Sequence, residues 1–463
     1  MDLPPIPPRA LPPGAWAPAV RAARAVLKPA LRFAQIQAAS GIVLLFAAVV
    51  ALAWANSPWA ASYAAFWHTP LSVGIGPYRF ERDLHFWVND GLMAIFFFVV
   101  GLEIRRELHE GELATLRRAA LPALAAVGGM VVPAALYVAM NPGPPGNRGW
   151  GVPMATDIAF AVGVLTLLGH RVPPSLRVML LALAIIDDLG AILVIAIFYS
   201  GPMNPLGVTA AGAGILLTLA LQRFGVRQVI AYVPPALLTW GGTYASGIHP
   251  TIAGVVIGLL TPVRSWLGGE GFLAEAERAI EFVKARASHA GAHELARPLS
   301  ALDSARREAV PPATWLELTF HPWVAWVIMP VFALANAGVS LAGVSLADPT
   351  RAAVVGGVVA GLVFGKPVGI LLFSFLGVKL LGLQLPPAID RKEMSVLGLV
   401  AGIGFTMSIF IAGLAFTDPA LLAAAKLGVL GASLIAGVLG LVGGYLFLKP
   451  DPSQTGDARM GAH

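Results

Sequence analysis

The feature that most constrains this chain is a succession of long apolar segments, each about as long as a lipid bilayer is thick. A membrane-spanning helix needs about 20 consecutive, mostly apolar residues. Because only helices and closed barrels satisfy every backbone polar group in lipid, segments of this length predict helices. We expect about twelve spans, at 38–55, 84–103, 119–140, 150–169, 176–199, 205–222, 227–245, 248–262, 323–341, 352–378, 394–416 and 424–448. The predicted fold class is therefore an all-α polytopic membrane protein.

The composition excludes most other classes of protein. Of the 463 residues, 57% are hydrophobic and 12% are charged, whereas soluble domains average about 45–50% and about 25%. So few charges do not cover the water-facing surface of a soluble enzyme. The hydrophobicity also excludes a disordered chain and a nucleic-acid binder, despite the net charge of +6. The absence of cysteine rules out disulfides, thiolate metal sites and cysteine nucleophiles.

The distribution of basic residues predicts the orientation of the chain. With the N-terminus in the cytoplasm and the spans alternating, 25 of the 31 Lys and Arg residues fall on the cytoplasmic side and 5 on the outer side, while Lys366 alone lies deep inside a span. Cytoplasmic loops carry such an excess of basic residues. Both termini are therefore predicted to be cytoplasmic.

The spans divide the chain into five parts. Residues 1–37 are predicted to be a Pro-rich, extended cytoplasmic tail, and 38–262 hold the first eight spans. Residues 263–321 form a long polar cytoplasmic loop that contains a helix. The last four spans lie within 322–448, and 449–463 are a cytoplasmic C-terminal tail.

One outer segment has the pattern of a strand. Leu71, Val73 and Ile75 alternate with small residues ahead of a Gly-Pro pair, and a period of two is typical of a strand. Residues 70–82 are therefore either a hairpin, which is a candidate dimer contact, or an ordinary loop.

Four charged residues lie inside apolar runs, where charges are expensive. They are Asp157, Asp187, Asp188 and Lys366. Each costs about 2.5–3.5 kcal/mol on insertion scales unless it is paired. Three carboxylates against one ammonium group leave an excess of negative charge that structural ion pairs do not explain. We interpret the four residues as a functional cluster.

The chemistry of carboxylates in an apolar setting indicates what such a cluster does. Desolvation raises the pKa of a carboxyl group and lowers that of a lysine, so that protons exchange nearer cellular pH. A carboxylate is also a hard oxygen ligand that suits a small cation. A site that holds either protons or a cation is an exchanger. Because Asp187 and Asp188 are adjacent, they point about 100° apart on a straight helix and do not form a face-to-face dyad.

Two of the predicted spans are interrupted. The segment 150–169 has Pro153 and Thr156 ahead of its acid, and 394–416 contains Gly402, Gly404 and Thr406. Paired broken spans in two halves of a chain are typical of transporters built from inverted repeats. Such breaks leave positive N-termini and negative C-termini of half-helices at membrane depth. On this interpretation Asp157 neutralises N-termini and Lys366 neutralises C-termini.

Several motifs carry a family likeness. They are GLEIRREL (101–108), ATDIAF (155–160), LAIIDDLG (183–190), HPWV (321–324), ANAG (335–338), GKP (365–367) and GIGFTMSIF (402–410). In this order the chain resembles the NhaA family of bacterial sodium/proton antiporters over residues 35–448. Any one motif is weak, but together they are highly specific.

The resemblance implies a fold and an activity. The fold would have twelve spans and an inverted-repeat core with two broken, crossing helices. The protein would not be an enzyme and would need no cofactor. It would exchange intracellular Na+ or Li+ for extracellular H+ at about two protons per Na+, electrogenically and with activation at alkaline pH. It would support sodium and pH homeostasis from the bacterial inner membrane, commonly as a homodimer.

The resemblance also implies roles for individual residues. Asp188 would be the main ligand for the cation and the proton, with Asp187 as its partner at the Na+ site. Asp157 would be a further carboxylate of the site that binds the cation and protons in turn, beside Thr156 and the second broken helix. Lys366 would compensate helix dipoles and pair with an aspartate. Residues that match family positions tied to pH response are Glu103, Arg106, Glu107 and Glu317, with His321 nearby and His249 in Gly-Ile-His-Pro.

Two other functions fit buried acids and are weighed against exchange. An intramembrane aspartyl protease needs two aspartates that share one proton, but Lys366 has no role in such a dyad and a Gly-x-Gly-Asp signature is missing. A channel or symporter on a similar scaffold stays open, since it differs from an exchanger in its rate and coupling and not in its residues.

Overall fold

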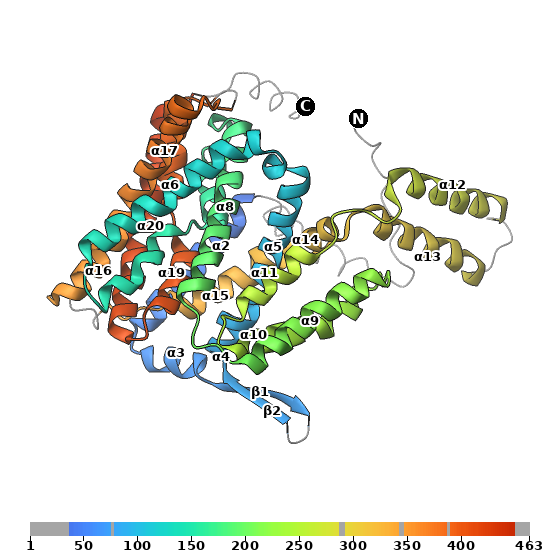
Figure 1. The fold of residues 1–463 in the computed structure, drawn as a ribbon, viewed down its shortest axis with the longest axis horizontal. Helices are drawn as coiled ribbons and strands as arrows, with labels where there is room; N and C mark the ends of the chain where they lie inside the picture. The colour runs from blue at the N-terminus through green and yellow to red at the C-terminus, as the bar shows by residue number, and fades with distance from the viewer. Residues whose placement is uncertain (1–36, 76–77, 287–291, 342–346, 387–388, 450–463) are drawn as a thin grey trace, which may run out of the picture.

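The computed structural model describes residues 37–449, apart from 76–77, 287–291, 342–346 and 387–388. Within these residues the chain is a bundle of helices with one two-stranded sheet (Figure 1). Apart from Gln37 and Lys449, the two predicted tails lie outside the described residues.

The elements of the first half follow in chain order. They are α2 (Gln37–Ala55), α3 (Ala60–Trp67), β1 (Pro70–Ile75), β2 (Tyr78–Asp83), α4 (Leu84–Phe86), η1 (Trp87–Leu92), α5 (Met93–Glu110), η2 (Glu112–Ala114), α6 (Leu116–Met140), η3 (Gly146–Met154), α7 (Ile158–Leu167), η4 (Gly169–Arg171), α8 (Pro174–Phe198), α9 (Pro205–Arg223), η5 (Val229–Tyr232) and α10 (Val233–Ser246).

The second half begins with the short helix α11. Its elements are α11 (Thr251–Leu260), α12 (Gly268–Arg286), α13 (Ala292–Ala309), α14 (Pro312–Trp323), η6 (Val324–Ile328), α15 (Met329–Asn336), α16 (Pro349–Ala360), η7 (Gly361–Gly365), α17 (Lys366–Leu381), α18 (Arg391–Ala401), α19 (Phe405–Ala415) and α20 (Pro419–Phe447).

Every predicted span coincides with helix, and the predicted fold class is confirmed. Among the described residues, seven helices are long and apolar enough to cross a membrane, or up to ten if each bent pair is one span. The two predicted spans that are not counted are those of α10 and α11. These helices have 14 and 10 residues, which is short for a complete crossing of the membrane. The chain is an all-α, multi-pass membrane protein.

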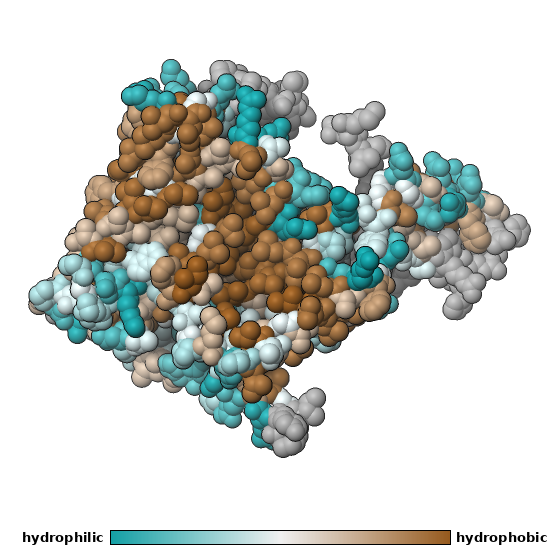
Figure 2. All heavy atoms as spheres, viewed as in Figure 1, coloured by the Kyte–Doolittle hydropathy of each residue, from teal (hydrophilic) through white to brown (hydrophobic). Residues whose placement is uncertain are grey.

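The surface of the bundle has the polarity that a bilayer requires. Apolar side chains cover α6, α17 and the region of α9 and α10, while polar side chains gather at the ends and on the projecting α12–α13 pair (Figure 2). In mid-helix positions Leu216 is 67% exposed and Phe364 is 63% exposed. Exposed apolar side chains in a continuous band face lipid and not water.

Glycines set the contact between α6 and the long span that runs from α16 to α17. Gly357, Gly361, Gly365 and Gly369 recur every four residues, a pattern that predicts a close-packed helix face. A Cβ at Gly365 would lie 2.8 Å from the Cα of Pro133 on α6, and one at Gly369 would clash with the carbonyl oxygen of Gly128. The prediction is confirmed, and this packing fixes the helix that carries Lys366.

Of the two alternatives for residues 70–82, a hairpin or an ordinary loop, the structure shows the hairpin. Strands β1 and β2 are antiparallel, with Leu71 opposite Arg82 and Val73 opposite Phe80. The hairpin lies at one end of the bundle, together with α3 and the start of α20 (Figure 1). We call this end the hairpin face.

The long loop after α11 differs from the prediction. It contains two helices, α12 and α13, which pack on each other and project from the bundle (Figure 1). The next membrane helix begins at Pro312, within the predicted loop 263–321, and runs as one candidate span to Asn336. Pro312 stands in the first turn, where a proline without an N–H is tolerated. Glu317 and His321 therefore belong to a membrane helix and not to a loop.

Candidate ion-binding site

The core of the site is the crossing of two broken helices. The pair η3 and α7 bends by 46°, and the pair α18 and α19 bends by 47°. The extended residues between the halves meet, since the backbone N–H of Asp157 donates to the carbonyl oxygen of Ile403 at 2.7 Å. The hydroxyl of Thr156 lies 3.1 Å from the carbonyl oxygen of Ala401, at the end of α18. Four half-helix ends therefore meet inside the bundle.

Asp157 lies between two helix N-termini. Its Oδ1 accepts the backbone N–H of Phe160 at 3.0 Å, which caps α7. Its Oδ2 accepts the backbone N–H of Thr406 at 3.1 Å and the hydroxyl of the same residue, at the start of α19. A carboxylate at a helix N-terminus satisfies free N–H groups and complements the dipole. The fully buried Asp157 does this for both half-helices at once.

Lys366 lies at the opposite kind of helix end. Its Nζ donates to Asp187 Oδ2 at 2.7 Å and to the carbonyl oxygen of Met154, the last residue of η3. The side chain is 0% exposed. A cation beside the C-terminal carbonyl groups of a half-helix complements the negative end of its dipole. Lys366 therefore meets both an acid and a helix end.

Thr156 connects the Lys366 pair to the second broken helix. Its Oγ1 lies 2.7 Å from Asp187 Oδ2, in addition to its contact with Ala401. A hydroxyl carries one proton, so Thr156 donates to one of these oxygens at a time. Asp187 Oδ2 can therefore accept hydrogen bonds from both Lys366 and Thr156, or from Lys366 alone.

Beside the crossing, two buried carboxylate oxygens have no hydrogen-bond partner among the described residues. They are Asp187 Oδ1 and Asp188 Oδ1, and both side chains are 1% exposed. Neighbouring carboxylates also act electrostatically on Asp188, which has Asp187, Glu103 and Asp157 around it. A buried acceptor without a partner is costly, and a cation or a proton would satisfy it.

The donor set of the site consists of carboxylates with hydroxyl and carbonyl oxygens nearby. In the part of the chain that the structure describes, no three acidic or histidine side chains converge closely enough to hold a metal ion. A cation at Asp187 and Asp188 would complete its shell from hydroxyl, carbonyl or water oxygens, all of which are hard ligands.

The glycines of the second broken helix allow its backbone to approach η7 and the first broken helix closely. A Cβ at Gly402 would lie 2.5 Å from the carbonyl oxygen of Leu362, and one at Gly404 would lie 3.0 Å from the carbonyl oxygen of Ala155. A larger residue at Gly404 would push the two broken helices apart, and one at Gly402 would push the second broken helix away from η7.

The structure adds two hydroxyl groups that the sequence analysis did not single out as site residues. Ser408 Oγ donates to the carbonyl oxygen of Val152 on η3 at 2.7 Å. Ser433 Oγ on α20 accepts the backbone N–H of Phe405 at 3.0 Å. Ser408 stands in a conspicuous motif, but Ser433 is one hydroxyl in a long apolar helix, and serine there gives no signal by itself.

The predicted pH-response residues come together only in part. Arg106 Nη1 pairs with Glu317 Oε1 at 2.7 Å, which joins α5 to α14. Glu103 and Glu107 interact electrostatically with this pair, and Glu107 Oε1 accepts the backbone N–H of Glu112 at 2.7 Å. The exposed His321 follows one turn after Glu317.

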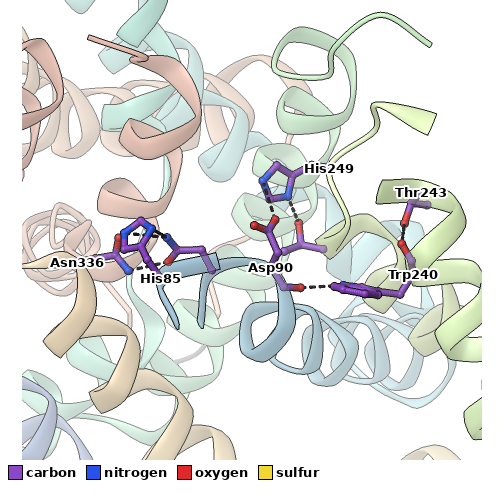
Figure 3. Close-up of polar contacts among 8 residues, drawn as sticks. His85, Asp90, Trp240, Thr243, His249 and Asn336 are labelled. Atoms are coloured by element: carbon purple, nitrogen blue, oxygen red, sulfur yellow. Dashed lines mark hydrogen bonds and ion pairs between the residues drawn. The ribbon is translucent and has the colours of Figure 1, made fainter. Parts of the chain in front are cut away.

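His249 does not join that cluster. It lies between α10 and α11, where its Nε2 is 3.5 Å from Asp90 Oδ1 and its Nδ1 is 2.9 Å from the hydroxyl of Thr251 (Figure 3). Its ring also contacts the ring of Phe410 at 5.5 Å between centroids. His249 is therefore a packed residue that links α10–α11 to η1 and α19.

Comparison with known proteins places this geometry in a family. The model of the family described as "Na+/H+ antiporter 1" matches residues 31–443. The chain is 58% identical over 443 residues to Na(+)/H(+) antiporter NhaA 2 of Sorangium cellulosum, covering 96% of this chain and 95% of the relative. It is 57% identical over 454 residues to the protein of the same name from Myxococcus xanthus, covering 98% and 95%.

A third relative is more distant but still similar throughout. Na(+)/H(+) antiporter NhaA 2 of Pseudomonas putida is 54% identical over 426 residues, covering 92% of this chain and 94% of the relative. Transporters of this kind are not enzymes. The family match over most of the chain, and these identities, show that the chain belongs to the NhaA family of Na+/H+ antiporters.

Proposed function

We propose that the chain exchanges intracellular Na+, or Li+, for extracellular H+, and that Asp187 and Asp188 bind the cation and the protons in turn. The observation that carries the proposal is the buried, unpartnered Oδ1 of Asp188 beside an equally unpartnered Oδ1 of Asp187. A proton on one side of the membrane and Na+ on the other each satisfy these oxygens. Because the two ligands compete for the same atoms, each expels the other.

Asp157, Lys366 and Thr156 act on the site without carrying the cargo. Asp157 holds the N-termini of α7 and α19, and Lys366 holds the end of η3. These contacts keep the broken helices crossed while the surrounding helices move. When Na+ binds, Asp187 exchanges part of its contact with Lys366 for the cation.

The proposed cycle moves net charge. Two carboxyl protons travel inward for one Na+ that travels outward, as the family resemblance implies. One elementary charge crosses per cycle, and each 100 mV of membrane potential contributes about 2.3 kcal/mol per charge. An inside-negative potential therefore drives Na+ export.

The cluster around Arg106 is the proposed site of activation by alkaline pH. Arg106 and Glu317 join α5 to α14, and Glu103 is close enough to Asp188 to act on its charge. A change of protonation among these groups would alter both the α5–α14 contact and the field at the site. His249 is too remote from this cluster to share that role directly.

The location of the protein follows from its charges. We propose that it lies in the bacterial inner membrane with both termini in the cytoplasm, which makes the hairpin face the outer one. The excess of basic residues at the opposite end supports this orientation. The hairpin exposes Leu71 and Val73, and we propose that it contacts a second copy in a homodimer.

The contacts of Asp187 bear on the two alternative functions, an aspartyl protease and a channel or symporter, in different ways. In an aspartyl protease the two acids face each other, whereas Asp187 faces Lys366 and Thr156. A channel or symporter on this scaffold would have the same buried crossing and differs from an exchanger in its rate and coupling, which a measurement of reversal potential against pH and Na+ gradients separates. Exchange therefore fits these contacts better than proteolysis does.

Proton flux in everted membrane vesicles tests the proposal. After respiration acidifies the lumen, addition of Na+ or Li+ should dissipate the pH gradient between pH 7 and 9, and addition of K+ should not. Imposing a membrane potential should change the rate, since the cycle is electrogenic. Intact, well-folded protein that leaves the gradient unaffected by Na+ across this range would rule the proposal out.

A further inference from the structure

A second lysine lies inside the membrane region, on the hairpin side of the site. Helix α20 begins at Pro419, with Asp418 as its N-cap, five residues before the predicted span. Lys426 is therefore in the third turn, about 10 Å along the helix axis at 1.5 Å per residue. The predicted span 424–448 put Lys426 at its outer edge, among the charges of the outer side, whereas the earlier start of α20 places it further inside the helix.

Lys426 stands on the face of α20 that contacts the crossing. It precedes Ser433 by seven residues, which on an α-helix places both side chains within about 20° of each other. Ser433 accepts the backbone N–H of Phe405, and the next residue, Thr406, donates to Asp157. Lys426 is thus two turns from the crossing, in the direction of the hairpin face.

Within the described residues, Lys426 has no ion pair and no hydrogen bond. The residue is only partly exposed, so water does not fully compensate its charge. It does act electrostatically on His85, in α4 at the foot of the hairpin. An unpaired ammonium group in this setting is costly and needs an explanation.

Two layers of side chains lie on the hairpin side of the crossing. The outer layer is polar, since Asn336 Nδ2 donates to Asn89 Oδ1 at 2.7 Å and the Asn89 amide contacts His85 at 3.1 Å (Figure 3). The inner layer is aromatic, with the ring of Phe410 at 5.5 Å from Phe97 and 6.1 Å from Phe332.

The layers follow one another along the helices. Phe410 is one turn after Thr406 on α19, and Asn336 is one turn after Phe332 on α15, where its Nδ2 donates to the carbonyl oxygen of Phe332. The order from the crossing outward is therefore carboxylates, aromatic rings and then the amide–histidine layer with Lys426 beside it. A cation that took a route from the hairpin face to the site would meet these layers in the reverse order.

We propose that Lys426 is a charge gate on this route, which opposes the approach of a cation from the hairpin face. The inference rests on the proposed function, which makes that face the outer one. When the aromatic layer opens outward, the ammonium charge disfavours Na+ in the vestibule and so promotes its release. A field of one sign changes the local concentration of a small ion about tenfold or more. Lys426 acts on Na+ through its charge alone and does not bind Na+ or the transported protons.

Sided transport kinetics test this gate. In right-side-out vesicles, Lys426→Gln should lower the KM for external Na+ about tenfold, because the opposing charge is gone. In everted vesicles the KM for Na+ at the other face should stay within about twofold of wild type, since Lys426 does not face that route. Lys426→Arg keeps the charge and should match wild type at both faces. Lys379→Gln removes an exposed lysine of α17 and should change neither value.

The outcomes separate the gate from the exchange itself. If wild type exchanges Na+ for H+ but Lys426→Gln leaves both KM values unchanged, or shifts them equally, Lys426 is no gate and only anchors α20. If wild type shows no exchange, the proposed function fails and the gate fails with it. Should Lys426→Gln not fold, Lys426→Met, which keeps the unbranched stem without the charge, is measured in the same way and decides between these outcomes.

Discussion

Replacing Asp188 with asparagine should abolish Na+-dependent proton movement while the protein still folds and inserts. The amide is close in size to the carboxylate, but it carries neither a titratable proton nor the negative charge that binds Na+. Folding should survive because Asp188 Oδ1 has no hydrogen-bond partner to lose, and removal of a buried charge relieves repulsion from Asp187 and Glu103. We expect exchange in everted vesicles to fall below detection from pH 7 to 9.

The control for this variant is Asp303→Asn. It removes a carboxylate from the projecting helix α13, where Asp303 is half exposed and pairs with Arg306, and exchange should remain at the wild-type rate. Melting of the purified proteins should show that both variants are folded. Exchange that persists in a folded Asp188→Asn variant would remove Asp188 from the mechanism.

Replacing Lys366 with alanine should have the largest effect on stability. The change leaves the Asp187 carboxylate buried without its cation and leaves the carbonyl oxygen of Met154 without that donor. Removal of one partner from a buried ion pair costs about 3–5 kcal/mol. We therefore expect a clear fall in the melting temperature in detergent, together with an altered charge moved per Na+.

A double variant distinguishes the lost pair from a general packing defect. Combining Lys366→Ala with Asp187→Asn removes both charges, so part of the lost stability should return, because no uncompensated carboxylate remains. A Lys366→Ala protein that melts at the wild-type temperature and transports with unchanged electrogenicity would contradict both assigned roles. A double variant that is less stable than either single variant would show that packing, and not charge, dominates.

The charged residues of the site could be predicted from the sequence because placing each charge in lipid costs free energy. Asp157 and Lys366 stood out in apolar runs, and their assignment to opposite half-helix ends agrees with the contacts to Thr406 and Met154. The breaks were readable for a similar reason, since proline and glycine interrupt otherwise uniform segments. The structure shows both bends, at 46° and 47°.

The sequence did not predict which side chains of the site pair with each other. Adjacent residues on one helix point in different directions, and only the packed structure decides that Asp187, and not Asp188, meets Lys366. The partner of Thr156 could not be predicted either. A threonine next to Asp157 in the sequence indicates a hydroxyl group close to the site, but not that it bonds to Asp187. These choices depend on how α8, the broken helices and α17 pack, which the pattern of one chain does not specify.

Helix ends were the least predictable part of the fold. The start of α20 at Pro419 follows an Asp-Pro signal that hydrophobicity alone passes over. Lys426, which the predicted span 424–448 put at its outer edge, therefore lies further inside the helix. The start of α14 at Pro312 was missed because Glu317 and His321 made the segment read as a loop. In both cases a polar residue inside a membrane helix was mistaken for the end of that helix.

Competition between Na+ and protons is the central claim, and one measurement tests it without a membrane. Purified protein in weakly buffered detergent at alkaline pH is titrated with Na+ while the pH of the solution is recorded. The account predicts proton release that saturates with Na+, is absent on addition of K+, and is lost in Asp188→Asn. Na+ that binds, as detected by calorimetry, without releasing protons would contradict the account.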